Sequence, residues 1–470
     1  MNFIKNLYLI KSLTSTDLKS RLIKLSVFLL FIVLTAVNFN FNFFVFTLAT
    51  IYILFERSSS SVIWIAIIGI NSYVRYTYLI LLLLLLSLIL MVKFVRDLVN
   101  KKISIKNWRI ITLLSLLLLV ITLMLIPIAS NYSLYSQLTS TFLFTCLVFC
   151  VIYAKEINVR DFLLLFVISV LGLYILLSFT NLFTNLGFEQ FKNPLPNGKM
   201  VSRYSPFGNP NFTTLILFCV FSVLYVLYRS KNLNRILYYI LHTITLSFIL
   251  LTISKTSVIV LAIFYIFIFI ENIILAKKHK NKKYIYDILY FIASLLISIL
   301  LCYKHATALL LRFIDSNSIS EDITTNISNL TTGRLNIWIN YIHAIFNSVS
   351  LFLFGYGAGS SNINNIPAHN TVIEYIYKYG AIVTLALIAI FIISIIPYLK
   401  KLKLYKLMPL ILITATLLTI GSIHPKYIYA FAIMFLSFII ETNQKEVNNI
   451  ANKIQKSTKE VGDTNENTRN

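Results

Sequence analysis

The chain has 470 residues, of which 58% are hydrophobic and 12% are charged. Soluble domains average about half apolar and about a quarter charged residues, so this composition excludes a soluble globular enzyme. The net charge of +24, from 41 basic and 17 acidic residues, would suggest nucleic-acid binding in a soluble protein. In a membrane protein, cytoplasmic loops collect Lys and Arg, so we expect a lipid bilayer and no nucleic acid as partner.

Apolar stretches recur along nearly the whole chain and predict an all-α polytopic membrane protein with about 12–14 transmembrane helices. The candidate spans are residues 22–38, 41–55, 61–74, 76–92, 110–130, 138–153, 162–180, 211–228, 236–254, 257–275, 284–303, 371–397, 407–423 and 427–441. We expect residues 1–441 to form one transmembrane domain. Residues 442–470 are polar and predict a disordered cytoplasmic tail.

The distribution of basic residues predicts the topology. Threading the candidate spans from a cytoplasmic N-terminus places 31 of the 41 basic residues inside. Both termini are then cytoplasmic. The two long connections, residues 181–210 and 304–368, are then outside. Long loops often carry function, so we look for the site there.

The first outer loop ends in a segment rich in turn-forming residues, from Ser202 to Asn211. This segment holds Arg203, whose planar donor groups suit phosphate oxygens, near the start of the next helix. Asn209 and Asn211 are further candidates for contacts with a substrate, and Asn211 is also a candidate helix cap. The alternative is an interfacial arginine that faces lipid headgroups.

The second outer loop contains Gly333-Arg334 and a helical pattern. Apolar residues recur every three or four positions at Leu335, Trp338, Ile342, Ile345 and Val349, as in a helix at a membrane surface. Arg334 falls in the first turn, where free backbone N–H groups attract anions. A solvated arginine on an amphipathic helix is the alternative.

A glycine-rich turn with Gly355 and Gly357 follows, and then His369-Asn370, where the chain re-enters the membrane. Glu374 continues an ionisable cluster at the outer end of a spanning segment. A neutral imidazole there can accept a proton from a sugar hydroxyl, and a charged one can bind phosphate. A structural interfacial histidine is the alternative.

Lys255 ends a spanning segment on the outer side and is a candidate member of the same basic cluster, or a lysine that only reaches the interface. The outer loops carry no DxD motif, and the four cysteines lack the spacing of a zinc site. We therefore expect neither a metal nor a cofactor.

Taken together, these segments resemble the bacterial O-antigen ligase and O-antigen (capsular polysaccharide) polymerase superfamily over about residues 200–382. The matching elements are Arg203 with Asn209-Pro210-Asn211, Gly333-Arg334 with Trp338, Gly355-Tyr356-Gly357, and Ala368-His369-Asn370 followed by Gly380.

The resemblance implies a membrane glycosyltransferase of the broad C-type architecture in the bacterial cytoplasmic (inner) membrane. It implies an undecaprenyl-pyrophosphate-linked oligosaccharide donor and a glycan or lipid-linked glycan acceptor at the outer face. His369 would then activate the acceptor hydroxyl, while Arg203 and Arg334 would bind the pyrophosphate. Further substrate contacts are expected from Asn209, Asn211, Lys255, Gly333, Trp338, Gly355, Gly357, Asn370 and Glu374. Flippase and chain-length regulator proteins are further expected partners in capsule or exopolysaccharide biosynthesis.

We prefer polymerisation of polysaccharide repeat units, because nothing in the sequence marks a lipid A core acceptor. A ligase shares the same motifs and is the first alternative. A lipid-linked oligosaccharide flippase is the second, although a transporter should carry ionisable residues inside its helices, where this chain has few.

Overall fold

The protein is described here as a computed structural model. The structure describes residues 16–37, 42–55, 76–100, 108–125, 145, 148–149, 151–153, 159–184, 192–194, 200–204, 210–280, 283–314, 334–357, 363, 366, 368–399, 402–419 and 433–440. Of the candidate spans, residues 61–74 lie outside this part of the chain, as do most of residues 138–153. The predicted tail, residues 442–470, also lies outside it.

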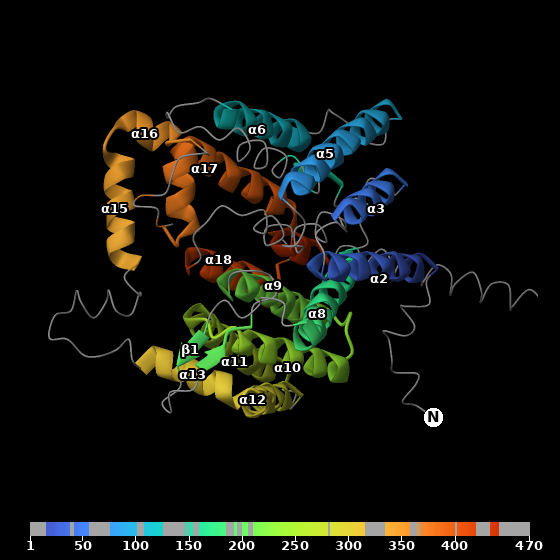
Figure 1. The fold of residues 1–470 in the computed structure, drawn as a ribbon, viewed down its shortest axis with the longest axis vertical. Coiled ribbons are helices and arrows are strands. Elements are labelled where there is room, and N and C mark those ends of the chain that lie inside the picture. The colour runs from blue at the N-terminus through green and yellow to red at the C-terminus, as the bar shows by residue number, and fades with distance from the viewer. Residues whose placement is uncertain are drawn as a thin grey trace, which may run out of the picture.

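The described chain is helical apart from one short β-hairpin (Figure 1). The N-terminal helices are α2 (Thr16–Val37), α3 (Asn42–Phe55), α5 (Tyr76–Val99), α6 (Trp108–Leu125) and α8 (Val159–Thr184). The middle of the chain forms α9 (Pro210–Arg229), α10 (Arg235–Leu251), α11 (Lys255–His279), α12 (Lys283–Leu301) and α13 (Tyr303–Ile314). The C-terminal elements are α15 (Arg334–Phe346), α16 (Val349–Phe354), α17 (Thr371–Leu399), the 3₁₀ turn η4 (Leu404–Lys406), α18 (Leu407–Thr419) and a helical segment at 433–440.

Within the described residues, five helices are long and apolar enough to cross a membrane. They are Val159–Leu177, Pro210–Arg229, Lys255–Lys278, Lys283–Leu301 and Thr371–Leu399. Shorter apolar helices accompany them. The prediction of an all-α membrane protein is confirmed at this level.

Helix α9 is the centre of the bundle. Its residues from Thr213 to Tyr228 are buried against α8, α10 and α18. Helices α11 and α12 instead expose large apolar side chains such as Ile266 (60% exposed) and Leu300 (74% exposed). Exposed apolar surface of this extent fits contact with lipid. The apolar residues of α9 therefore pack against other helices, whereas many of those of α11 and α12 form a membrane-facing surface.

Helix α17 contains Pro397, which has no N–H to donate to the carbonyl of Ile393, four residues earlier. Arg109 of α6 supplies the missing donor, because its Nε lies 3.2 Å from the Ile393 oxygen and its Nη2 bonds the Ser394 oxygen. A backbone carbonyl without a partner is costly in an apolar environment. This contact therefore fastens α17 to α6, far away in the sequence.

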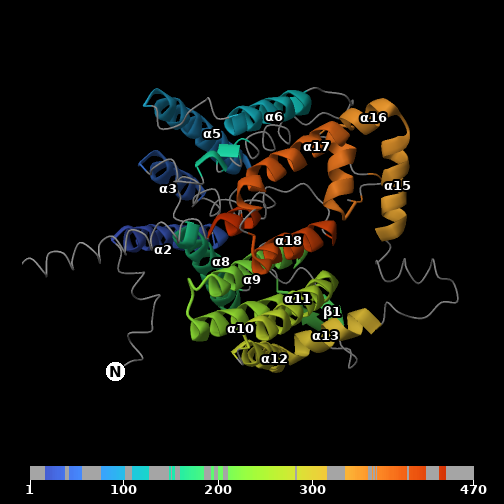
Figure 2. The ribbon, with the colours of Figure 1, turned by 180° about the vertical axis from the view of Figure 1, so that it is seen from behind.

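The loop before α9 contains the only strands that the described residues form, β1 (Lys192–Pro194) and β2 (Met200–Ser202). They pair antiparallel, with Lys192 opposite Ser202 and Pro194 opposite Met200. The sequence analysis did not predict this hairpin. In Figures 1 and 2 the hairpin and α13 lie on the same side of the bundle as α15.

Candidate functional site

The predicted site residues fall into two clusters. The His369 cluster consists of Arg334, Trp338, His369, Asn370, Glu374 and Lys378, from α15 and the start of α17. The Arg203 cluster consists of Arg203, Asn211, Thr252, Ser254, Lys255 and His305, around β2 and the ends of α9, α10, α11 and α13. Of the candidate residues, Asn209 and Gly333 lie outside the described part of the chain.

His369 sits directly before α17 in a left-handed backbone conformation, with a φ of 53°. Such a conformation is uncommon for residues other than glycine, although His adopts it more often than most residues, as do Asn and Asp, and it costs about 1–3 kcal/mol. Asn370 follows as the helix cap, because its Oδ1 accepts from the N–H groups of Val372 and Ile373 at 3.0 and 3.2 Å. The cap explains how α17 begins here and why the histidine is held at its entrance.

Arg334, the first residue of α15, lies close enough to His369 to act on its charge. Burial lowers the pKa of His369 below its ordinary value, and the positive charge of Arg334 lowers it further. The imidazole is therefore biased toward its neutral form, in which a ring nitrogen can accept a proton. This is the electrostatic state that a general base requires.

Helix α15 holds the segment that leads to His369. Trp338 donates its indole N–H to the Ala368 carbonyl at 2.7 Å. Tyr341 donates to the Ile366 carbonyl at 2.8 Å and accepts from the Ile363 N–H at 3.2 Å. Besides its predicted contact with substrate, Trp338 therefore has a structural role, because it holds the residue that precedes His369.

The predicted helix after Arg334 is present as α15, and the side that packs against the protein includes Tyr341, which lies outside the predicted apolar stripe. Tyr341 and Ile345 are the buried side chains of α15, whereas Ile342 is 43% exposed. Val349, which is 75% exposed, belongs to the next helix, α16. Tyr341 is buried because α15 packs against α17 through its ring. The exposed Ile342 fits the predicted position of the helix at a membrane surface.

Gly355 and Gly357 join α16 to a kink in α17. At Gly380 the backbone turns to a φ of 78°, and the chain interrupts its helical hydrogen bonds there. The carbonyls of Tyr377 and Lys378 instead accept from the N–H groups of Tyr356 and Gly357, each at 2.8 Å. This is a structural function for the turn that the sequence analysis assigned to substrate binding.

Two glycines allow this junction to form. A Cβ on Gly355 would overlap the backbone of Lys378, and a Cβ on Gly380 would overlap the backbone of Leu353. Both glycines also have positive φ, which disfavours other residues. The close packing of the two backbones therefore requires glycine at both positions.

Glu374 lies in the first turns of α17 and is fully buried. Its Oε1 accepts from Lys378 at 2.8 Å, while its Oε2 has no hydrogen-bond partner. Glu374 also lies near Tyr341, where burial, together with this carboxylate, raises the pKa of the phenol to about 12. A buried carboxylate oxygen without a donor is costly, and a hydroxyl from a bound molecule would satisfy it.

The Arg203 cluster is held by backbone contacts. Arg203 donates its Nε to the Thr252 carbonyl at 3.0 Å, and the N–H of Tyr204 donates to the Leu251 carbonyl at 3.0 Å. Asn211 is the second residue of α9, and its Oδ1 accepts from Ser254 at 3.0 Å. The predicted cap role of Asn211 is wrong, because α9 already begins at Pro210. Lys255 follows Ser254 as the first residue of α11.

His305 of α13 is a member of this cluster that sequence reasoning missed. Burial lowers the pKa of His305, a hydrogen bond to the Ser202 backbone opposes this effect, and Lys304 adds to it. His305 therefore holds β2 next to Arg203. Its position in the second long connection was the only available signal, since α13 carries none of the resembling motifs.

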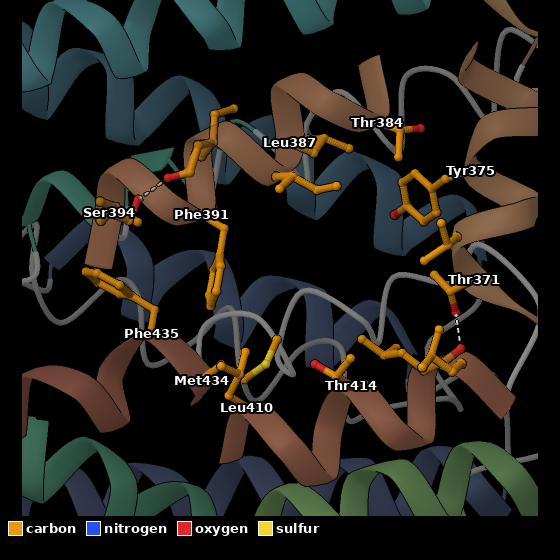
Figure 3. Close-up of a pocket in the computed structure, with 16 residues that line it drawn as sticks. Thr371, Tyr375, Thr384, Leu387, Phe391, Ser394, Leu410, Thr414, Met434 and Phe435 are labelled. Atoms are coloured by element: carbon orange, nitrogen blue, oxygen red, sulfur yellow. Dashed lines mark hydrogen bonds between the residues drawn. The ribbon is translucent and has the colours of Figure 1, made fainter. Parts of the chain in front are cut away.

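An apolar cavity of about 250 Å³ opens beside the His369 cluster. It begins at Thr371 and Val372, the second and third residues after His369, and extends along α17 to Ser394. Figure 3 shows Tyr375, Phe391 and Thr414 pointing into this space. The sequence gives no signal for the cavity, because its lining cannot be told from ordinary membrane helix.

A second group of ionisable residues, which we call the buried ion network, joins the C-terminal parts of α9 and α11 to the N-terminal parts of α10 and α12. Its members are Tyr225, Tyr228, Arg229, Arg235, Glu271 and Asp287. Glu271 and Asp287 lie within predicted spans, so they are exceptions to the expected lack of charge inside helices.

The carboxylates of the buried ion network are paired. Asp287 lies 2.8 Å from Arg235 and 3.5 Å from Arg229, and Tyr228 donates to both its oxygens at 2.9 Å. Glu271 lies 3.5 Å from Arg229 and accepts from Tyr225. Such compensation is what buried charge needs in order to be tolerated, and it indicates a structural role.

No family model, curated protein or solved structure matches the chain.

Proposed function

We propose that the protein is a membrane glycosyltransferase that acts on undecaprenyl-pyrophosphate-linked glycans at the outer face of the bacterial cytoplasmic membrane, and that it polymerises polysaccharide repeat units. The observation that carries this proposal is the position of His369 before α17, close enough to Arg334 for its positive charge, together with burial, to lower the pKa of the imidazole. The resemblance of the motif-bearing segments to O-antigen ligases and polymerases supplies the substrate class and the broad C-type architecture.

In the proposed reaction, the acceptor hydroxyl oxygen attacks the anomeric carbon of the donor sugar. Its proton passes to His369, which is biased toward the neutral form. The bond from the anomeric carbon to the phosphate oxygen breaks, its electron pair leaves with undecaprenyl pyrophosphate, and the anomeric configuration is inverted. No net proton or electron is gained from outside.

Arg334 and Arg203 are the proposed partners of the leaving pyrophosphate. Neutralising the departing charge lowers the barrier when the donors are already in place, and backbone contacts of the Arg203 side chain keep it ordered. The side on which both clusters lie is assigned to the outside by the charge count of the sequence. With two arginines for this task, we propose a reaction without metal.

Glu374 is a proposed substrate contact of the same cluster. Its buried Oε2 lacks a donor, and a sugar hydroxyl would satisfy it. Asn370 is proposed to act through the cap of α17 instead, because its side-chain oxygen already accepts two backbone N–H groups.

Ligase activity remains the alternative within this class, since donor and site are shared. A flippase is the alternative outside it. The charges of the buried ion network are paired with one another, which supports a structural role better than a transport path. We therefore place the glycosyltransferase first.

The experiment incubates the purified protein, without added metal, with its undecaprenyl-pyrophosphate repeat unit. Products are separated on a gel and released undecaprenyl pyrophosphate is quantified. We expect a ladder of polymers from the wild type and none from His369→Ala. His343→Ala is the matched control, because His343 is an exposed histidine on α15 that should leave the ladder unchanged.

Other outcomes identify the alternatives. A single product that forms only when a separate acceptor is added would establish a ligase. No release of the lipid pyrophosphate with any acceptor would contradict a glycosyltransferase, and movement of intact donor across a vesicle membrane would then support the flippase.

A further inference from the structure

The apolar cavity owes its shape to the kink at Gly380. The kink divides α17 into an N-terminal arm, residues 371–379, and a C-terminal arm, residues 381–399. The two arms and α18 frame the space, and the helical segment at 433–440 closes it with Met434 and Phe435 (Figure 3). A straight α17 would not leave this angle open.

The lining of the cavity offers little to a polar molecule. It is built mostly from aliphatic and aromatic side chains of α17 and α18, among them Leu387, Phe391 and Leu410. Three of its hydroxyls are already used. Thr384 bonds the Gly380 carbonyl, Ser394 bonds the Ile390 carbonyl, and Thr371 bonds the Leu417 carbonyl across to α18, all at 2.6–2.9 Å. An apolar occupant is what such a lining favours.

The two ends of the cavity differ in chemistry. One end adjoins the His369 cluster, where the positive charge of Arg334 lies close to His369. The other end, at Ser394 and Phe435, lies deep along a helix long enough to cross a membrane. A molecule that fills both regions has an anionic head and a long apolar tail.

The cavity is also open to its surroundings on one side. Val372, Ile388 and Leu418 belong to its lining and are each 42–47% exposed. A tail can therefore enter sideways from the bilayer. The volume of about 250 Å³ lies below the roughly 300–1,000 Å³ of pockets that enclose a whole drug-sized ligand, so only part of a long tail fits inside.

We propose that this cavity binds the part of the polyprenyl tail nearest the pyrophosphate, and that the remainder of the tail leaves through the open side into the bilayer. The proposal rests on the proposed function for the identity of the lipid. It assigns to α17 and α18 the binding of the first part of the tail, separately from the chemistry at His369.

The test compares two tryptophan variants on α17. Leu387 lines the cavity, whereas Leu385, two residues earlier, is 64% exposed and absent from the lining. Transfer is measured with two donors that share the pyrophosphate and glycan but carry either a C55 polyprenyl chain or, in its place, a single methyl group. We expect Leu387→Trp to raise KM about tenfold for the C55 donor, equivalent to losing the burial of about two methylene groups. Leu385→Trp should change neither KM.

With the methyl donor, which has no tail to place in the cavity, KM of Leu387→Trp should stay near the wild-type value. Equal increases for both donors, or equal effects of the two variants, would overturn the proposed tail site. Thr414→Phe is a second variant in case Leu387→Trp does not fold, because Thr414 is exposed toward the cavity from α18 and leaves room for a larger side chain.

A binding measurement separates this proposal from the proposed function. A benzophenone amino acid at position 391 of the full chain is irradiated with undecaprenyl pyrophosphate, in detergent and then with a tenfold excess of phosphatidylglycerol. We expect a crosslink to the polyprenyl chain that survives the phospholipid. Its presence in a protein that shows no transfer would contradict the glycosyltransferase and support the tail site. Its replacement by a phospholipid crosslink would overturn the tail site.

Discussion

The His369 cluster and the buried ion network use similar residues in opposite ways. In the network, Asp287 is met by Arg229, Arg235 and a tyrosine hydroxyl. In the His369 cluster, the positive charge of Arg334 acts on a histidine whose backbone is itself unfavourable, and Glu374 keeps one oxygen without a partner. Paired charges hold the helices together in the network, whereas in the His369 cluster the Glu374 oxygen that Lys378 leaves without a hydrogen bond is a feature of a site prepared for a ligand.

The largest expected effect follows from breaking the network. Asp287→Asn removes a buried charge and leaves two arginines without it, which should lower the free energy of unfolding by about 3–5 kcal/mol. Thermal unfolding of the purified protein in detergent measures the loss. Arg235→Gln is the matched control with an effect of at most about 1 kcal/mol, because the Arg235 side chain is 33% exposed. A stable Asp287→Asn variant without transfer would place the network in the chemistry.

The second prediction concerns His369→Asn, which should separate activity from stability. Loss of a general base lowers the rate by about 10²–10⁴-fold. Asparagine adopts the left-handed conformation of this position at least as readily as histidine, so the melting temperature should stay about the same. Transfer assays and thermal unfolding on one preparation check both parts. A large fall in melting temperature would mean that the histidine is structural.

The third prediction tests the kink. Gly380→Ala places a Cβ against the Leu353 backbone at a positive φ and should destabilise the protein by about 1–3 kcal/mol. Gly172→Ala is the matched control, since a Cβ there makes only ordinary contact with Leu29 at 3.7 Å. Alanine in this helix should be neutral or stabilising by up to about 1 kcal/mol. Similar melting temperatures for the two variants would contradict the close packing of α16 on the kink.

The smallest expected effect is a shift in pH dependence. Burial and Arg334 lower the pKa of His369, so the unfolded chain takes up this proton at a higher pH than the folded chain does. The contribution of His369 to stability therefore falls as the pH drops below about 6.5. In Arg334→Gln part of the lowering is lost, and the acid limb of the transfer rate should move to higher pH. An unmoved acid limb would mean that another group controls it.

Much of the fold follows from hydropathy. The predicted span 211–228 is observed as Pro210–Arg229, and the predicted span 371–397 as Thr371–Leu399. Hydropathy shows how apolar a segment is but not where its helix axis bends, so the kink at Gly380 was not predicted. The hairpin at β1 and β2 was missed as well, because strands of three residues carry too short a pattern.

The candidate site was predictable where charge marks it. Arg334 and His369 stood out as ionisable residues at helix ends, and the structure brings them together. Asn370, Gly355 and Gly357 also stood out, but their contacts show structural work in a cap and a junction. His305 and the buried ion network went unrecognised because their partners are far apart in the sequence, and pairing of that kind is visible only in three dimensions.

The contact of Arg109 with the carbonyls near Pro397 has a consequence for how the protein is made. Helix α6 leaves the ribosome long before α17, so the Arg109 guanidinium at the end of its span has to remain without these carbonyl partners until α17 is synthesised. When α17 is inserted, its open carbonyls near Pro397 gain the hydrogen-bond donors that the proline cannot supply. These hydrogen bonds therefore favour docking of α17 beside α6, a helix that was synthesised much earlier.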